Sequence, residues 1–269
     1  MKTPCLLLTI VATLASAQPS GTGRLSPGST PTRSAVNLTG SEFIVPQFIV
    51  GGEWTSTIKL TNNGTADIPT SNVWLIDNAG QPLTATFQIS SGATITDTGF
   101  TFRLQAGDTI ELAFTGGPDA KFGHARIDSN ACPQTASCSL YAEVTLRNTA
   151  TGRPYLEAIF PLEAASALQY MLWDHRNGYW TVLYLVNDNG SPATVSLEFR
   201  DYVNKVIGTY SLTMPGGGAQ IMKLHEIMPQ TIGTYGNLII RGQNAVVATG
   251  LRITPSNTFT PIRAFVAKQ

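Results

Sequence analysis

Short runs of alternating hydrophobic and polar residues recur along the chain from about residue 43 onward. In the run Trp54–Thr61, Trp54, Ile58 and Leu60 share one face, and turn-forming residues follow the run. A period of two is typical of half-buried strands, and no stretch keeps the period of an amphipathic helix. The pattern therefore predicts an all-β fold. The strands expected in the first half are Phe43–Val50, Trp54–Thr61, Asn72–Asp77, Leu83–Ile89, Thr109–Phe114, Phe122–Asp128, Ser139–Asn148 and Tyr155–Leu162.

The second half of the chain repeats this pattern and leaves no helix long enough to cover a parallel sheet. Seven or eight short strands in a unit of about a hundred residues are typical of an immunoglobulin-like sandwich, and the lack of helices argues against an α/β fold. The strands expected here are Leu168–Trp173, Tyr179–Asn187, Thr194–Asp201, Val206–Met214, Gln220–Leu224, Tyr235–Arg241, Ala245–Thr254 and Phe259–Val266.

Two matching segments indicate that the halves are duplicates. Gly52-Glu53-Trp54-Thr55 aligns with Gly178-Tyr179-Trp180-Thr181, and an Asn-Gly turn follows each, so that both features recur after 126 residues (54 to 180 and 64 to 190). This period fits a duplicated domain and is too long for a solenoid repeat. We therefore expect two tandem immunoglobulin-like β-sandwich domains, residues 43–163 and 166–269. They should superpose, with Trp54 and Trp180 as equivalent buried residues.

The N-terminus has the features of a cleaved secretory signal. Lys2 precedes an apolar run that begins at Cys5, and Ala15-Ser16-Ala17 supplies small residues at the cleavage point. Residues 1–17 are therefore predicted to be a signal peptide, which implies a secreted, periplasmic or cell-surface protein. Residues 18–42 are rich in Pro, Gly, Ser and Thr and poor in large apolar side chains, and this composition predicts a disordered leader.

Two cysteines, Cys132 and Cys138, remain once the signal is removed. In an oxidising compartment, an isolated pair this close in sequence is expected to form one local disulfide. A metal site would need further Cys or His residues nearby in the sequence, and there are none. So short a loop contributes only about 2 kcal/mol, and the fold must therefore depend on hydrophobic cores.

Charge and hydropathy exclude two classes of partner. Lys plus Arg and Asp plus Glu both number 17, and without a basic patch a nucleic acid is not an expected ligand. No apolar stretch beyond the signal approaches the length of a transmembrane segment. The expected partner is a protein or a glycan, with self-association as a further expectation, and no cofactor is predicted.

The sequence contains no recognisable catalytic set. His124, His175 and His225 are not at metal-ligand spacing, and neither Gly-x-Ser-x-Gly nor His-Glu-x-x-His occurs. Pro215-Gly216-Gly217-Gly218 precedes an expected strand and lacks the Lys-Ser/Thr of a phosphate loop, so it is interpreted as a tight turn. No enzyme activity and no metal site are predicted.

Comparison of the strand faces between the halves predicts an interaction surface. With the tryptophan face of each strand in the core, Leu183 and Leu185 point outward where the first half has Thr and Lys. Trp74 and Ile76 point outward where the second half has Glu and Arg. Large apolar residues paired on an outer face favour a contact between domains or between molecules. The alternative is that loops such as the insertion around Ser90–Phe100 cover them within one domain.

A candidate ligand loop lies at the end of the second sandwich. It contains Trp173, Asp174, His175, Arg176 and Tyr179. Loops at the ends of sandwiches often bind ligands, and aromatic rings beside hydrogen-bonding groups suit sugars and peptides. The alternative, which the general burial of tryptophan favours, is that Trp173 closes the edge of the core and the other residues are solvated.

The second half also contains Gly250-Leu251-Arg252-Ile253-Thr254-Pro255, followed by Phe259-Thr260. Together with the Trp-Thr strand, the Asn-Gly turn and Asp201, these residues resemble a tandem immunoglobulin-like β-sandwich module of uncharacterised secreted bacterial proteins, notably those of acidobacteria. The resemblance extends from about Phe43 to Lys268 and implies secretion and tandem sandwiches, without assigned catalytic residues. The first half departs from the pattern through the Ser90–Phe100 insertion and the cysteine loop.

These features favour a non-catalytic secreted protein of two β-sandwich domains, used in cell-surface structure, adhesion or protein contact. A carbohydrate-binding module, or an accessory of a secreted enzyme, is the first alternative and rests on the Trp173–Tyr179 loop. A periplasmic pilus-type chaperone is the second alternative, because it also combines a signal with two such domains. The sequence lacks the basic anchoring pair and the long alternating edge strand that such a chaperone needs.

Overall fold

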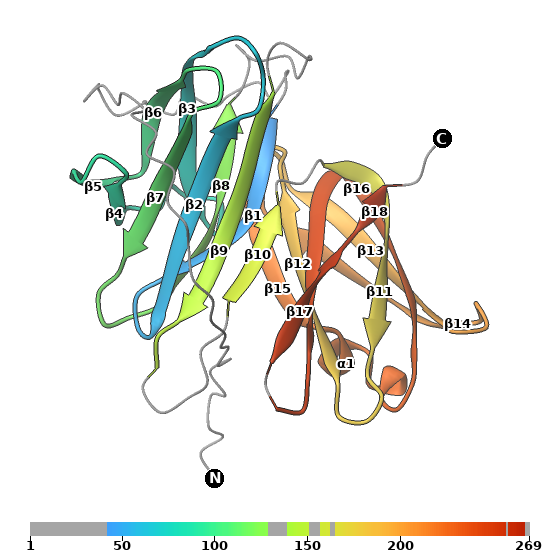
Figure 1. Cartoon of the computed structure of the whole chain (residues 1–269). Coiled ribbons are helices and arrows are strands. Elements are labelled where there is room, and N and C mark those ends of the chain that lie inside the picture. Colours follow the sequence, from blue (N-terminus) through green and yellow to red (C-terminus); the bar gives the residue numbers. More distant parts are fainter. Residues whose placement is uncertain (1–41, 129–138, 151–156, 162–164, 257, 267–269) are drawn as a thin grey trace.

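A computed structural model shows the protein as two β-sandwiches packed side by side (Figure 1). The structure describes residues 42–128, 139–150, 157–161, 165–256 and 258–266. Within these ranges the strands pair antiparallel, and the helices are the single turn α1 (Leu224–Ile227) and the short 3-10 helix η1 (Pro229–Thr231). The predicted all-β class is confirmed. The expected signal peptide and the pair Cys132 and Cys138 lie outside the described residues.

The first sandwich consists of two facing sheets. One sheet has the order β1 (Glu42–Val50), β8 (Lys121–Asp128), β3 (Ile68–Asp77) and β6 (Gly99–Leu104). The other has the order β10 (Glu157–Pro161), β9 (Leu140–Asn148), β2 (Trp54–Asn62), β7 (Thr109–Thr115), β4 (Ala85–Ile89) and β5 (Thr94–Asp97). Their inner faces enclose a core rich in aromatic rings, including Phe48, Phe87 and Phe114.

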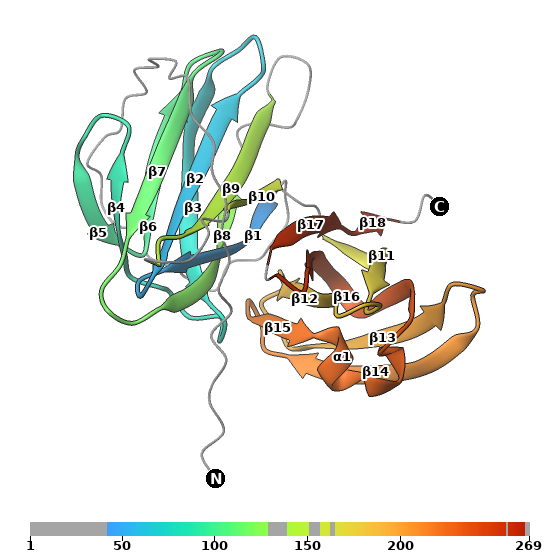
Figure 2. The same cartoon turned by 60° about the horizontal axis from the view of Figure 1, so that its bottom comes forward.

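The second sandwich is one sheet that folds over along β16 (Tyr235–Ile253), a strand of 19 residues (Figure 2). The first part of β16 lies between β11 (Ser166–Asp174) and β13 (Ala193–Asp201), with β18 (Phe265–Val266) and β14 (Val206–Met214) at the edges. The later part pairs with β17 (Phe259–Arg263) and β12 (Trp180–Asn187), and β12 also pairs with β15 (Ala219–Lys223).

The two sandwiches share one pairing order. The order β1-β8-β3-β6 matches β11-β16-β13-β14, and β10-β9-β2-β7 matches β17-β16-β12-β15. The first sandwich adds β4 and β5, and the strands β5 and β6 occupy a region where the sequence analysis predicted only an insertion. The predicted strands Tyr235–Arg241 and Ala245–Thr254 are instead parts of one strand, β16.

Two patterns of side-chain hydrogen bonds occur in both sandwiches. The hydroxyls of Ser56 and Thr181 each bond to the backbone seven residues earlier. The amides of Asn62 and Asn187 each donate to the carbonyl four residues later, at 2.8 and 2.9 Å. The residues that make these matching bonds in β2 and β12 are 125 residues apart (56 to 181 and 62 to 187), one fewer than the sequence alignment predicted.

This difference of one residue reverses the predicted faces of β12. Leu183 and Leu185, predicted to point outward, are fully buried in the core of the second sandwich. Val182 and Tyr184, predicted to lie in that core, instead join the hydrophobic cluster of the first sandwich. Because successive side chains of a strand point to opposite faces, a shift of one residue exchanges the two faces.

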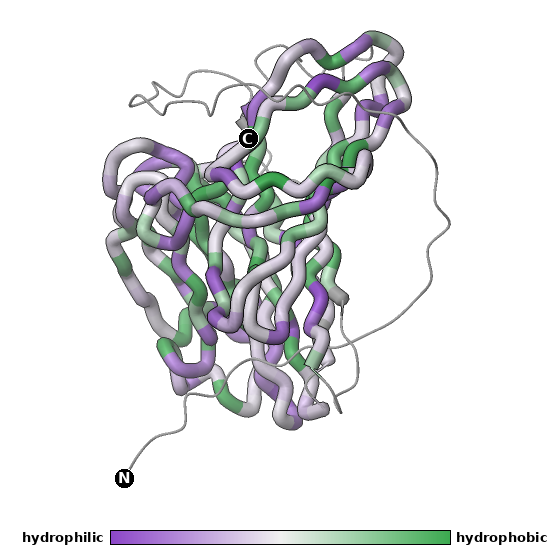
Figure 3. Tube along the Cα trace, turned by 90° about the vertical axis from the view of Figure 1, so that its left-hand side faces the viewer, coloured by the Kyte–Doolittle hydropathy of each residue, from purple (hydrophilic) through white to green (hydrophobic). Residues whose placement is uncertain are grey.

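The tryptophans that suggested the duplication differ in their surroundings. Trp54 is 4% exposed, as predicted, and every second residue of β2 is buried. Alternation of hydrophobic and hydrophilic positions is visible along the strands in Figure 3. In β12, by contrast, all residues from Thr181 to Asn187 are buried, and Trp180 is only half-buried. A strand covered on both faces has no polar side, so its pattern does not indicate which face belongs to its own core.

The outer face of β1, β8 and β3 packs against the second sandwich. Arg126 of β8 forms an ion pair with Asp188, and the backbone N–H of Ala219 donates to the carbonyl of Asn78 at 3.0 Å. The apolar part of this contact is a buried cluster of Ile44, Val186, Ala219 and Val247. The sandwiches are thus joined by apolar, hydrogen-bonded and ionic contacts.

Trp74 and Ile76 lie on this outer face of β3. They alternate with the core residues Val73 and Leu75, so their predicted direction away from the first core agrees with the structure. Arg126, which reaches Asp188, is directly opposite Trp74 in the neighbouring strand. Trp74 is half-buried and Ile76 is 2% exposed, so neither forms the open apolar surface that was expected.

Candidate functional site

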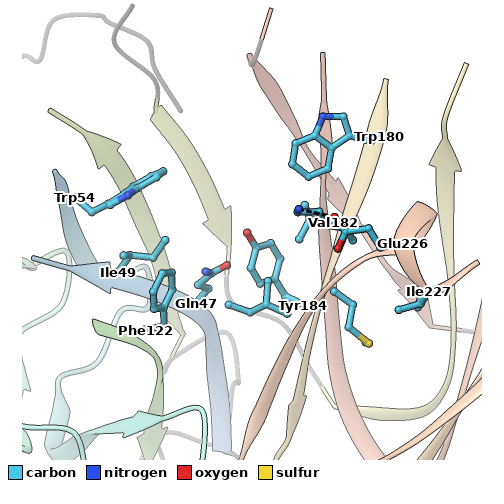
Figure 4. Close-up of a pocket in the computed structure, with 12 residues that line it drawn as sticks. Gln47, Ile49, Trp54, Phe122, Trp180, Val182, Tyr184, Glu226 and Ile227 are labelled. Atoms are coloured by element: carbon cyan, nitrogen blue, oxygen red, sulfur yellow. Dashed lines mark hydrogen bonds and ion pairs between the residues drawn. The ribbon is translucent and has the colours of Figure 1, made fainter. Parts of the chain in front are cut away.

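A cleft of about 310 Å³ opens between the two sandwiches, and we call it the interdomain cleft. Figure 4 shows Trp54, Ile49, Phe122 and Gln47 on one side and Trp180, Val182 and Tyr184 on the other. The four aromatic rings come from the starts of β2 and β12, from β8 and from the middle of β12. Aromatic walls with a few polar groups are typical of small-molecule sites.

Gln47 places an unusual polar group in this cleft. It lies at an irregularity in β1 between Val45 and Phe48, where Pro46 supplies no backbone donor. Such bulges redirect side chains. Gln47 is 2% exposed, its side chain is hydrogen-bonded with Tyr184, and its Oε1 has no partner among the described residues. An unpartnered acceptor at this depth costs free energy unless a ligand or water donates to it.

Tyr184 carries the hydroxyl beside Gln47. Burial raises the pKa of this phenol well above its ordinary value, although the hydrogen bond with Gln47 acts in the opposite direction. The hydroxyl therefore stays protonated at physiological pH, because its pKa in water is already about 10. Tyr184 can act in the cleft as a neutral hydrogen-bonding group and not as a phenolate base.

One positive and one negative side chain, Lys223 and Glu226, also line the cleft. Lys223 Nζ lies 2.6 Å from Glu226 Oε1 and 5.6 Å from the ring centre of Trp180. The turn of helix α1 holds these residues, since Lys223 precedes the helix and Glu226 lies within it. Both side chains are partly exposed, so they can exchange their ion pair for ligand hydroxyls.

Of the candidate ligand loop, Trp173, Asp174 and Arg176 line one groove on the second sandwich, whereas His175 and Tyr179 do not line it. Trp173 is 1% exposed and packs in the core of the second sandwich, which agrees with the alternative interpretation of this residue. Asp174 accepts two hydrogen bonds of 2.9 Å from Arg176, and this contact is the main reason that the pKa of Asp174 is lowered. Tyr179 lies under the guanidinium of Arg252, 5.0 Å from the ring centre.

His175 is buried within an aromatic cluster. Its ring contacts Trp173 and His225, with centroids 5.1 and 5.6 Å away, and its Nδ1 is 2.7 Å from Thr231 Oγ1. Burial, with a smaller contribution from His225, lowers the pKa of His175 to about 4. No three His, Cys, Asp or Glu side chains in the described ranges are placed to hold a metal ion together.

Sequence reasoning missed most of the interdomain cleft. It assigned Trp54 and Trp180 to two separate cores and did not single out Gln47, Phe122 or Glu226. These residues come from five different elements, and no spacing in the sequence brings them together. The one available signal was Pro46 within an apolar strand, which marks an edge or a bulge.

Comparisons with known proteins add little to this description. No family model matches the chain, and no curated protein matches it significantly. Among solved structures, a lectin from Pleurotus ostreatus in complex with GalNAc is 12% identical, with 91% of this chain and 86% of that chain covered and a TM-score of 0.16. A TM-score this low carries no inference about this chain. None of the described helices is long and apolar enough to cross a membrane.

Proposed function

We propose that the protein is a non-catalytic secreted binding protein of the adhesion type, and that its interdomain cleft binds a carbohydrate. The observation that supports this most directly is the buried, unpartnered Oε1 of Gln47 in a cleft lined by aromatic rings. Such an acceptor fits the hydroxyl of a sugar, whose apolar C–H face can pack on Trp180 or Phe122. The cleft volume of about 310 Å³ is at the lower end of the range for small-ligand sites, which suits one sugar unit.

Binding without chemistry is the better proposal for this cleft. Hydrolysis of a glycosidic bond ordinarily uses two carboxylates on either side of the bond. Among the described residues that line the cleft, Glu226 is the one carboxylate, and Lys223 pairs with it. A single ion-paired carboxylate can accept hydrogen bonds from hydroxyls but does not supply both an acid and a base.

We further propose that the sandwiches are a duplicated immunoglobulin-like pair, exported by the N-terminal signal. The shared pairing order and the repeated Ser/Thr and Asn hydrogen bonds support this proposal. In such a pair the second copy is docked so that a new ligand cleft forms between the two domains. Clefts at domain interfaces are common binding sites.

The test is calorimetric titration of the purified protein with a panel of neutral monosaccharides and disaccharides. We expect at least one sugar to bind, and Phe122→Ala and Trp180→Ala to weaken binding about tenfold or more, because each removes an aromatic contact. Tyr141→Ala is the matched control, since Tyr141 and Phe122 are both 38% exposed and Tyr141 does not line the cleft. Binding that is equally strong in all variants, or no binding across the panel, would contradict the proposal.

A further inference from the structure

The outer face of one sheet of the second sandwich carries a row of large apolar side chains. Phe265 of β18 lies directly opposite Tyr170 of β11, and Tyr170 lies directly opposite Ile239 of β16. Directly opposite residues of an antiparallel pair point to the same face, so these side chains form one row across three strands. Leu172, two residues after Tyr170, points to the same face. We call these four residues the β11 face.

Most of the β11 face is open to solvent. Leu172, Phe265 and Tyr170 are 58%, 61% and 37% exposed, whereas Met171 and Trp173, which alternate with them in β11, are buried in the core. In both views of the molecule, β11, β13 and β14 lie farther from the first sandwich than β12 and β15 do (Figures 1 and 2). A cluster of exposed Leu, Phe and Tyr side chains indicates a surface that another molecule covers.

The β11 face has the same place in the pairing order as the surface that joins the two sandwiches. That surface is the outer face of β1, β8 and β3, and these strands match β11, β16 and β13 in order. The turns after β3 and β13 match as well, since Asp77 and Asp201 each accept hydrogen bonds from the backbone N–H groups two and four residues later. The two faces can therefore be compared residue by residue.

This comparison places Tyr170 at the position of a residue that the other sandwich buries. Three residues before each aspartate, the paired positions across the sheet are Trp74, Arg126 and Ile44 in the first sandwich and Glu198, Ile239 and Tyr170 in the second. Ile44 is buried in the contact between the sandwiches. A face of this kind thus already docks on a sandwich within the chain, and the second one carries large apolar side chains without a described neighbour over them.

The partner that fits the β11 face best is the same face of a second copy. Within the chain, Ile44 packs on Val186 of β12 and Val247 of β16. The outer face of β2, which has the place of β12 in the pairing order, carries Thr57 and Lys59 instead. An apolar face does not dock well on this polar one, so copies are not expected to add head to tail. Contact of the β11 face with itself about a two-fold axis remains.

The size of the face and the net charge permit such a dimer. Strands lie about 4.8 Å apart and nine residues extend about 30 Å, so β11, β16, β13 and β14 together cover about 600 Å² in projection. Two copies then bury about 1,200 Å², the lower end of the range for specific interfaces. Lys plus Arg and Asp plus Glu both number 17, so two copies do not repel each other through net charge.

We infer that the protein forms a two-fold dimer through the β11 face, with Leu172 and Phe265 of each copy buried in the contact. None of the described residues that line the interdomain cleft comes from β11, β13, β14 or β18, so the cleft of each copy stays open. A dimer then carries two clefts, which raises its overall affinity for a ligand displayed in many copies. This consequence rests on the proposed carbohydrate binding, whereas the dimer itself does not.

Sedimentation velocity of the full chain tests the inference in the absence of sugar, at concentrations from about 1 to about 100 µM. We expect a dimer at the higher concentrations that dissociates on dilution. Added salt should leave the dimer intact, because its contact is apolar and is not screened. A monomer at every concentration would overturn the inference. Growth into larger polymers would overturn it too, because a two-fold contact closes after two copies.

Protein variants locate the contact. Leu172→Ser and Phe265→Ser should each raise the dissociation constant of the dimer at least about tenfold, because each removes an apolar side chain from the contact. Ile232→Ser is the matched control, since Ile232 is 64% exposed, follows η1 outside the β11 face, and should have no effect. Thermal unfolding checks that each variant is folded. A dimer that survives both Leu172→Ser and Phe265→Ser would overturn the inference, and sugar titration of Leu172→Ser tests the cleft separately.

Discussion

At the scale of single residues, buried polar side chains hold the ends of both sandwiches. Asn62 donates to the carbonyls of Ala66 and Gln105, and its Oδ1 accepts from the backbone N–H of Gly64. Asn187 repeats these bonds with Ser191, Pro215 and Asn189. Both asparagines are fully buried, so each satisfies backbone groups that no water reaches.

Removal of either asparagine should destabilise its own sandwich. We expect Asn62→Ala and Asn187→Ala each to lower the free energy of unfolding by about 1–3 kcal/mol, because buried carbonyls lose their donor. Urea denaturation measures the change. Asn63→Ala is the control, since Asn63 is exposed, and it should have an effect within about 0.5 kcal/mol. Equal effects of Asn62→Ala and Asn63→Ala would contradict this assignment.

His175 makes stability depend on pH. Its pKa is lowered to about 4 in the folded protein by burial, whereas an unfolded histidine titrates near 6.5. Below pH 6.5 the unfolded chain therefore binds a proton that the folded chain does not, and stability falls as the pH drops toward 4. His225, whose pKa is also lowered by burial, adds a loss of the same sign.

The variant His175→Gln isolates this contribution. Its free energy of unfolding should fall less steeply than that of the wild type between pH 6.5 and 4.5, because one proton-linked group is gone. Urea denaturation at several pH values gives both curves. Parallel curves for the two proteins would show that His175 is not the residue responsible.

At the scale of elements, the alternation of hydrophobic and polar residues identified the strands that have one solvent-exposed face. The bounds of β2 and β7 were predicted within one residue, because polar residues alternate with buried ones there. β12 is buried on both faces, so its pattern gave a strand but not its orientation. β5 and β6 were missed because a region of Ser, Gly and Thr resembled a loop.

The turn after β3 belongs to the contact between the sandwiches. Gly80 has φ +83°, and a Cβ built there would lie 2.3 Å from the carbonyl oxygen of Gly216 in the second sandwich. We expect Gly80→Ala to push these turns apart and to increase proteolysis at the boundary. Gly92→Ala is the control, since Gly92 has φ +90° but no atom within 4 Å of the added Cβ. That control should show only the cost of positive φ, about 1 kcal/mol. If both variants resist protease equally, Gly80 does not maintain the contact.

At the scale of the whole molecule, the contact between the sandwiches defines the cleft but leaves no simple trace in the sequence. Val182 and Tyr184 look like ordinary core residues of the second sandwich, yet they pack on the first. Trp74 and Ile76 were correctly placed away from their own core, but only the structure shows which surface lies opposite. Domain docking depends on side chains from distant strands, so strand periodicity predicts the sandwiches and not their arrangement.

The ion pair between Arg126 and Asp188 is a charged link across this contact. The side chains are 5% and 17% exposed, and burial raises the pKa of Asp188 even though Arg126 lowers it. Desolvation of both charges offsets much of their attraction, so the pair contributes less to net stability than its geometry suggests. Loss of only one partner should destabilise the protein strongly, because the other charge stays buried without compensation.

Removal of one partner should therefore destabilise the protein, and removal of both should restore most of the lost stability. We expect Arg126→Met to cost about 3–5 kcal/mol and Arg126→Met with Asp188→Leu to recover most of that loss, because the double variant leaves no buried charge. Calorimetry should show the wild-type transition split in the single variant, as the sandwiches begin to unfold separately. Lys59→Met is the control, since Lys59 and Glu143 form a more exposed pair at 3.8 Å, and its cost should stay below about 1 kcal/mol. If the single variant melts as the wild type does, the sandwiches are held together by the apolar contact around Ile44 and the interdomain cleft does not need this ion pair.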